Sequence, residues 1–258
     1  MCLLVLAWEV HPVYRLIVAA NRDEFHDRPT QAMSIWPSDD IIGGRDLRAG
    51  GTWLAMDRRR RFGIITNFRE LQRPQPDAPS RGNLIPGYLR NQAAAGGYLE
   101  QLHTGANAYS GFNLLLADPD ALWYGSNRAS PFQRRLEPGI YGLSNELLDT
   151  PWPKLQRVRR RFDPLVAQSD LTSESLFEIL ADRTQAGVSD ELPQTGLSEE
   201  WEQLLSSPFI SNEDYGTRCS TIVLVELSGR ALLIERRFDR AGHAVGETQI
   251  SLAAHDWR

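Results

Sequence analysis

Cysteine is scarce in this sequence, and long hydrophobic runs are absent. Cys2 and Cys219 are the two cysteines among 258 residues, and no C-x-x-C pair occurs, which excludes a secreted scaffold held together by disulfides. The five histidines are scattered without the spacing of metal ligands, so we expect no metal site and no cofactor. The apolar run over residues 3–8 is too short for a signal-peptide core or a membrane span. These absences predict a cytoplasmic protein with no membrane-spanning segment.

Basic residues are fewer than acidic residues in this chain. The chain has 28 Lys and Arg against 33 Asp and Glu, a formal net charge of −5 and a pI of about 5.6. A protein that neutralises many phosphates carries the opposite balance, so nucleic acid is excluded as a partner. With 41% hydrophobic and 24% charged residues the composition is that of a globular protein, and the length suits one domain over residues 1–258. The sequence indicates no oligomeric state.

Four pairs of short apolar segments predict β-hairpins. Each pair is separated by a short turn-forming stretch, and several segments are apolar on consecutive residues, which is typical of strands buried on both faces. The pairs are residues 3–8 with 14–20, 50–57 with 62–68, 111–118 with 121–127, and 220–227 with 231–238. The charged stretch DRRRRF that begins at Asp57 is expected to be a solvated hairpin tip. The glycine-rich stretch before Trp53 is expected to form tight turns.

Helical periodicity occurs between these pairs. It is clearest over residues 151–168, where apolar residues recur at 3.6-residue spacing and prolines stand at the start. Residues 173–184 predict a second helix, with Ser175 and Glu178 at the spacing of a capping box. Residues 82–102 predict a helix broken by Pro86 and by the glycines at 96 and 97. Hairpins with helices inserted in blocks predict an α+β domain in which two sheets lie between helical layers.

Cys2 is the first candidate for chemistry. If Met1 is removed, the thiol stands beside a free α-amine with an ordinary pKa of about 7.7 to 8.0, and such an amine can act as the base for its own side chain. The alternative is structural, because cysteine is among the most buried residue types and often packs as a small hydrophobe.

A polar cluster with the sequence NRDE follows the second predicted strand. It consists of Asn21, Arg22, Asp23 and Glu24, and the strand that carries it is expected to pair with the strand of Cys2. An arginine can lower the pKa of a thiol or bind a carboxylate, and an aspartate can accept a hydrogen bond from a terminal ammonium. The same residues are equally compatible with a salt-bridged strand exit.

Three further polar residues stand at predicted strand ends. Asn67 and Asn145 each follow a short apolar run, where an amide can donate to a developing oxyanion or can simply occupy a left-handed turn. Arg218 precedes an apolar strand, so its charge is expected at a sheet edge or in a pocket, where its pairing could be purely structural.

Several motifs together resemble one known family, the Transport and Golgi organisation 2 (TANGO2) family, whose members are also called NRDE proteins. The resemblance runs almost from end to end and includes CLLV, AANRDEFHDRPT, GGRDLRAGGTW, TNFRE, SRGNL, GFNLLLAD, YGLSNELLDTPWPK, LPQTG and YGTRCSTIVL. The family looks like a branch of the N-terminal nucleophile hydrolases and is similar to choloylglycine hydrolase and penicillin V acylase. The implied fold is a four-layer αββα sandwich of two mostly antiparallel sheets between helical layers.

The resemblance also implies roles for individual residues. Cys2 matches the nucleophile, Asp23 the acid near it, Asn145 the oxyanion amide, and Arg22 and Arg218 arginines of the site. One departure is that the hydrolases carry the arginine three residues before the acid, whereas here the two are adjacent. Contacts to the substrate are predicted for Asn21, Glu24 and Asn67.

Two functions follow from this resemblance. The first is an N-terminal cysteine hydrolase or acyltransferase that acts on an amide or thioester bond of a small molecule. The second is a non-catalytic protein that binds and transports haem or an acyl-CoA-like lipid on the same fold, because members of the family have been linked to haem mobilisation and lipid metabolism. The substrate itself is not indicated by the sequence.

Overall fold

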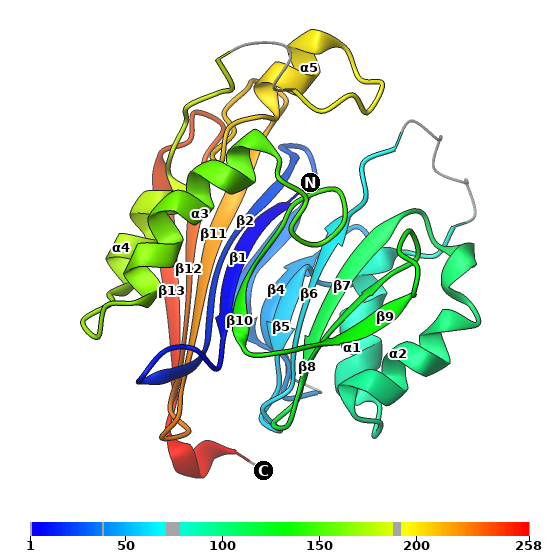
Figure 1. Ribbon diagram of the computed structural model, residues 1–258, viewed down its shortest axis with the longest axis vertical. Helices are drawn as coiled ribbons and strands as arrows, with labels where there is room; N and C mark the ends of the chain where they lie inside the picture. Colours follow the sequence, from blue (N-terminus) through cyan, green and yellow to red (C-terminus); the bar gives the residue numbers. More distant parts are fainter. Residues whose placement is uncertain (1, 38, 71–77, 188–191, 258) are drawn as a thin grey trace. The chain divides into compact units, whose positions relative to one another are not determined.

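The computed structural model describes residues 2–37, 39–70, 78–187 and 192–257 (Figure 1). The chain divides into two compact units. Unit 1 comprises residues 1–27, 138–144 and 148–254, and unit 2 comprises residues 28–137, 145–147 and 255–258. Each unit contains one antiparallel sheet with its own helices, so the protein has an α+β fold.

The sheet of unit 1 is built around the N-terminal hairpin. β1 pairs with β2 on one side and with β10 on the other, and every neighbouring pair of strands is antiparallel. The six strands, in spatial order, are β10 Gly139–Leu143, β1 Cys2–Trp8, β2 Tyr14–Phe25, β11 Tyr215–Glu226, β12 Ala231–Phe238 and β13 Ala244–Leu252. The predicted hairpins over residues 3–20 and 220–238 are therefore confirmed, and the strand that begins at Cys2 lies inside the sheet.

Helices cover one face of this sheet. α3, Pro153–Val166, and α4, Ser173–Leu180, pack against it (Figure 1), and the short helix α5, Glu199–Leu204, lies further along the chain. Side chains alternate between the two faces of a strand, and the alternate residues Leu3, Val5 and Ala7 of β1 share a core with α3 and α4. The apolar stripe predicted for residues 151–168 is this contact surface.

The cap predicted for α4 was wrong. The hydroxyl of Thr172 accepts a hydrogen bond from the amide of Ser175, so Thr172 and not Ser175 is the N-cap, while the helix begins at Ser173 as predicted. Thr172 is followed after three residues by a serine and not by a Glu or Gln, so the capping-box pattern did not identify it as the cap.

The sheet of unit 2 is a meander in which the strands lie in chain order. Its helices, α1 Leu84–Arg90 and α2 Ala95–His103, share a core with strand residues such as Ile65 and Leu114. The seven strands are β3 Thr30–Ile35, β4 Ile42–Asp46, β5 Leu54–Met56, β6 Phe62–Asn67, β7 Phe112–Ala117, β8 Leu122–Ser126 and β9 Gln133–Leu136. The predicted pairs β5–β6 and β7–β8 are confirmed.

The helix predicted over residues 82–102 is interrupted elsewhere than expected. The break lies between α1 and α2, while Pro86 is the third residue of α1 and Gly96 belongs to the first turn of α2. The first turn of a helix has N–H groups without intrahelical acceptors, so a proline is tolerated there. Gly96 is required by packing, because a Cβ at this position would lie 2.7 Å from the indole of Trp123.

The hairpin tip that begins at Asp57 is solvated only in part: Arg60 is exposed as expected, whereas the two ends of the charged stretch are buried. Asp57 and Arg61 are 2% and 6% exposed, and Nη2 of Arg61 lies 2.7 Å from a carboxylate oxygen of Asp57. The Arg61 guanidinium also donates to the carbonyls of Tyr88, Leu89 and Asn91 at the end of α1. Asp57 and Arg61 are buried because their charges are used to hold the end of a helix, which the composition of the tip does not reveal.

No helix among the described residues is long and apolar enough to cross a membrane.

Candidate functional site

The start of β1 faces an arginine across the sheet. Cys2 is the register partner of Arg22 in β2, and Arg22 is in turn the register partner of Cys219 in β11. Residues directly opposite each other on antiparallel strands share a face, so Arg22 lies between the positions of the two cysteines. Arg22 is 5% exposed, Cys219 is 3% exposed, and Nη2 of Arg22 lies 4.0 Å from Oε2 of Glu24.

A β-bulge places Arg218 beside this row. The register of β11 against β2 passes from Thr217 opposite Asp23 to Cys219 opposite Arg22, which leaves Arg218 as the extra residue. Bulges commonly redirect a side chain next to an active site. Nη1 of Arg218 donates to the carbonyl oxygens of Phe25 and His26, at 2.9 and 3.3 Å. Burial lowers the pKa of Arg218, and the positive charge of Arg22 lowers it further.

Asp23 lies on the opposite face of β2 from Arg22, because adjacent residues of a strand point to opposite sides. It is 1% exposed, and its carboxylate accepts a hydrogen bond of 2.8 Å from the hydroxyl of Thr217. That hydroxyl accepts in turn from the amide of Ile210. Burial raises the pKa of Asp23, and the charge of Lys154 opposes the rise more than any other group.

Lys154 is the residue of this site that the sequence analysis missed. It is 1% exposed and belongs to the first turn of α3. A signal was present, since Lys154 precedes Val158 and Phe162 at spacings of four residues and therefore lies on the apolar stripe of its helix. A lysine on a buried stripe requires a compensating charge, and Asp23 supplies it.

Asn21, predicted to contact substrate, is used inside the protein. Its amide nitrogen donates to the carbonyls of Leu180 and Pro208, both at 2.9 Å, and its oxygen accepts from the hydroxyl of Ser220 at 2.6 Å. Asn21 is 1% exposed, and its hydrogen bonds join the end of α4 to the sheet. Glu24, also predicted to contact substrate, has a side chain that is 27% exposed and accepts from the amide of Phe25.

The two predicted asparagines meet in unit 2. Nδ2 of Asn145 donates to the carbonyl of Asn67 at 2.9 Å, and the carbonyl of Asn145 accepts from the amide of Arg69 at 2.7 Å. Asn145 is fully buried, and the next residue is anchored by Asn113, whose amide donates to the carbonyl of Glu146 at 2.8 Å. The predicted residues therefore fall into two groups, one at the start of β1 in unit 1 and one at the end of β6 in unit 2.

Glycines in two of the quoted motifs have a structural explanation. Gly51 of GGTW and Gly82 of SRGNL bring their backbones together, and the amide of Thr52 donates to the carbonyl of Gly82 at 3.0 Å. A Cβ on Gly51 would lie 2.3 Å from that carbonyl oxygen. The close approach of the two backbones therefore requires glycine at position 51.

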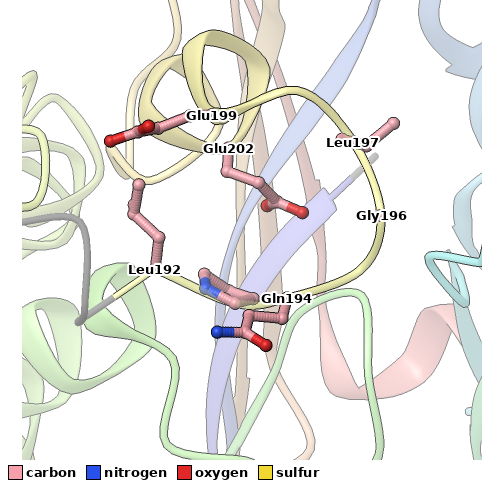
Figure 2. A pocket seen from close by; sticks show the side chains of 7 residues that line it. Leu192, Gln194, Gly196, Leu197, Glu199 and Glu202 are labelled. Atoms are coloured by element: carbon pink, nitrogen blue, oxygen red, sulfur yellow. The ribbon is translucent and has the colours of Figure 1, made fainter.

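A cavity of about 410 Å³ lies between α5 and the loop that precedes it (Figure 2). Its buried carboxylate, Glu202, already accepts from the amide and hydroxyl of Thr195. None of the predicted site residues lines this cavity. Elsewhere in the described parts of the chain, no three His, Cys, Asp or Glu side chains are grouped as a metal site.

Comparison with a solved structure defines the class of fold. The crystal structure of the mutant C2A conjugated bile acid hydrolase from Clostridium perfringens is similar to this chain with a TM-score of 0.52 over 98% of this chain and 92% of that one, at 7% sequence identity. The protein thus has the fold of the N-terminal nucleophile hydrolases, as the sequence predicted.

Comparison with known sequences defines the family. The model of the Transport and Golgi organisation 2 (TANGO2) family matches residues 1–240. The mouse (Mus musculus) Transport and Golgi organization 2 homolog is 34% identical over 262 residues, and the human (Homo sapiens) protein is 34% identical over 259; each comparison covers 92% of both chains. The chain therefore belongs to the TANGO2 family.

Proposed function

We propose that this protein is a hydrolase that uses Cys2 as an N-terminal nucleophile against an amide or thioester bond of a small acyl compound. The register at the start of β1 carries the proposal. Cys2 lies opposite Arg22, and β2 continues past this pair to Asp23. The amine of a chain that starts at Cys2 would therefore lie level with Asp23, next to the register position that Cys2 shares with Arg22.

The positive charges of Arg22 and Arg218 would favour ionisation of the Cys2 thiol. Arg22 is close enough to Arg218 for its positive charge to lower the pKa of Arg218, and together the two arginines would favour a thiolate and the negative charge that develops on the carbonyl oxygen of the acyl group. Asp23, with its charge supported by Lys154, would orient the terminal ammonium. Lys154 is thus a positioning residue, because it acts through Asp23.

The reaction takes two steps. The α-amine takes the proton of the thiol, and the thiolate attacks the carbonyl carbon to form a C–S bond. The C–N bond then breaks, and the leaving nitrogen takes the proton from the α-ammonium, which leaves the acyl group on sulfur as a thioester. Water attacks this thioester and gives a proton to the α-amine, and the C–S bond breaks to release the acid and restore the thiolate.

The oxyanion of both steps is assigned to Asn145 by the family resemblance. An amide donor in this role contributes about 3 kcal/mol to transition-state stabilisation. Asn145 belongs to unit 2, so its role is tested by substitution: Asn145→Ala should lower kcat about 100-fold or more while the chain still starts at Cys2.

The test begins with intact-mass analysis of protein without an added tag, where the proposal requires a chain that starts at Cys2. Iodoacetamide should then label Cys2 faster than Cys219, because Cys219 is 3% exposed. Cleavage is measured on a panel of small N-acyl amides and acyl thioesters with wild type, Cys2→Ser and the matched control Cys219→Ser. Cleavage by wild type and Cys219→Ser, lost in Cys2→Ser, is the expected result.

Two outcomes would overturn the proposal. One is retention of Met1 on essentially all molecules, since the α-amine of Cys2 would then be a peptide nitrogen. The other is a Cys2→Ser variant as active as wild type. Titration with haemin or acyl-CoA on wild type and Cys2→Ala examines the non-catalytic alternative, for which tight binding indifferent to the thiol is diagnostic.

A further inference from the structure

The sheet of unit 1 ends at a long strand whose outer side is unpaired. β13 pairs with β12 on one side and has no strand of the described chain on the other (Figure 1). The pairing is regular over residues 246–252, after an irregularity that leaves Val245 as an extra residue. Over these residues the backbone forms hydrogen bonds to no described residue outside β12. Such an edge presents N–H and C=O groups that can pair with another strand.

The opposite edge of the same sheet is closed by its own chain. β10 has five residues, and the loop that follows it bonds to its outer side. The amide of Gly142 donates to the carboxylate of Asp149 at 2.7 Å, and the amide of Asp149 donates to the carbonyl of Gly142 at 2.8 Å. A strand of another molecule would have to displace this loop before it could pair with β10.

The edges of the other sheet carry features that discourage pairing, and β13 lacks them. β9 has four residues, two of which are the exposed arginines 134 and 135, and β3 has an irregular register against β4. Short length, charge and bulges all protect sheet edges. β13 has nine residues with no proline and no lysine, and its one charged side chain, Glu247, accepts a hydrogen bond of 2.9 Å from Arg236 of its own sheet.

The regular part of β13 can pair with a second copy of itself. Two copies of a strand that are related by a two-fold axis perpendicular to the sheet are antiparallel, and each face of one continues into the same face of the other. An axis at Gln249 aligns the whole segment 246–252 with its copy. Each residue at or near this axis then has a defined partner.

The face of the sheet that carries α3 and α4 would pair polar residues. Gln249 is exposed and is the register partner of Ile234, which belongs to the core with these helices. Across the axis Gln249 lies opposite its own copy, and Glu247 lies opposite Ser251. These side chains can exchange hydrogen bonds, and no like charges are directly opposite each other. An axis at Glu247 would place two carboxylates opposite each other, which disfavours that register.

The other face would pair residues of complementary size. Thr248 lies opposite Ile250, two β-branched residues that suit a sheet, and Gly246 lies opposite Leu252. Nη1 of Arg237 donates to the hydroxyl of Thr248 at 2.7 Å, so this guanidinium is held within its own copy. Neither face therefore opposes the pairing.

We propose that β13 pairs with β13 of a second copy of this chain, with Gln249 on the two-fold axis, so that the sheets of two copies of unit 1 join in a homodimer. The dimer does not depend on the chemistry proposed for Cys2. A contact made by one pair of strands is small, so the association is reversible and depends on protein concentration.

The first experiment measures sedimentation velocity of protein without a tag from about 1 to 100 μM, a range that detects micromolar association. Wild type should pass from monomer to dimer. Gln249→Glu and Gln249→Lys each place like charges opposite each other on the axis, so each variant alone should weaken the dimer about tenfold or more. An equal mixture of the two should form a dimer again, because it pairs opposite charges. Leu227→Glu, at a 62% exposed position in the turn between β11 and β12, is the matched control and should dimerise as wild type does.

The second experiment tests the register. Directly opposite residues of antiparallel strands have Cα atoms about 4.5–5.5 Å apart, within the range of about 4.4–6.8 Å that a disulfide spans. Gln249→Cys in a Cys2→Ser background should therefore form a covalent dimer on mild oxidation. Thr248→Cys in the same background, whose side chain would lie opposite Ile250 and not opposite its own copy, should form far less.

Three results would overturn the inference. One is a wild type that stays monomeric at about 100 μM, which would leave this edge to a strand of another protein. Another is a dimer that both charged variants retain, since it would use a different surface. The third is a mixture of the two charged variants that stays monomeric although thermal unfolding shows each to be folded.

Discussion

Lys154 and Asp23 are two buried residues of opposite charge, each 1% exposed, and the charge of Lys154 acts on the carboxyl group of Asp23. Burial raises the pKa of Asp23, and Lys154 is the charge that does most to keep the carboxylate ionised. The lysine comes from the first turn of α3 and the aspartate from β2. The helix layer of unit 1 therefore takes part in the electrostatics of the candidate site.

Lys154→Met should cost about 3 kcal/mol of unfolding free energy at neutral pH, because it removes the charge that does most to compensate the buried carboxylate of Asp23. The removal of Lys154 raises the pKa of Asp23 further. Protonation then neutralises this carboxyl at acid pH, so the cost of the substitution should shrink as the pH falls. Chemical denaturation across the pH range measures it. The double variant Lys154→Met with Asp23→Asn should recover part of the loss, and strict additivity of the two single costs would contradict the pairing.

Asp57→Ala should destabilise unit 2 by about 3 kcal/mol, because the buried guanidinium of Arg61 loses the carboxylate 2.7 Å away. The matched control is Arg60→Ala on the same tip, where an exposed arginine that stacks on Trp257 is removed and about 1 kcal/mol or less is expected. Thermal unfolding monitored by circular dichroism compares the two variants. Equal effects would mean that the tip is held by something other than this ion pair.

Glu70→Gln should lower stability by about 1 kcal/mol at neutral pH and by progressively less in acid. The Arg128 guanidinium donates two hydrogen bonds to Glu70, of 2.7 and 2.8 Å, and holds the pKa of that carboxyl below its ordinary value of 4.5. A depressed folded pKa gives stability that is present above the unfolded value and is lost as the pH falls through the folded one. The estimate is small because both side chains are partly exposed. Glu100→Gln, an exposed glutamate of α2, is the control, and a difference between the variants that is independent of pH would refute the explanation.

Gly51→Ala should cost about 3 kcal/mol, because the new Cβ would lie 2.3 Å from the carbonyl oxygen of Gly82 and neither backbone segment can easily withdraw. Gly97→Ala offers an opposite expectation in the same unit. Its Cβ would meet ordinary contact at 3.7 Å within α2, and a helical alanine is favoured over glycine by about 0.5–1 kcal/mol. Unfolding curves for the two variants should shift in opposite directions.

The sequence predicted the elements whose pattern is local. The hairpin of β1 and β2 followed from two apolar runs around a turn. The NRDE cluster was expected at the exit of the second strand, whereas β2 continues through it, so Asn21 and Asp23 share one face while Arg22 points to the other. The strands β3, β4, β9, β10 and β13 were missed, because they are short or carry mixed polar and apolar residues that resemble turns.

Features that depend on distant partners could not be predicted in this way. The bulge at Arg218 arises from pairing with a strand about 190 residues earlier in the chain. The residues adjacent to Arg218 in the sequence do not predict it. The partner of Lys154 lies on another element, and the residues that bury Asp57 and Arg61 belong to α1. In each case the sequence shows the residue and its local pattern, but contacts with residues far along the chain determine its burial and its partners.

The position of Cys2 at the opening of an interior strand has a practical consequence for recombinant work. β1 is flanked by β10 and β2 along its length, so a purification handle fused ahead of residue 2 would emerge beside Arg22 and would turn the α-amine into an amide nitrogen. Under the proposed mechanism such material would fold and yet lack the base that activates the thiol. Preparations for activity screens should therefore carry any handle on the opposite terminus, and a negative screen with a leading handle is uninformative about the native molecule.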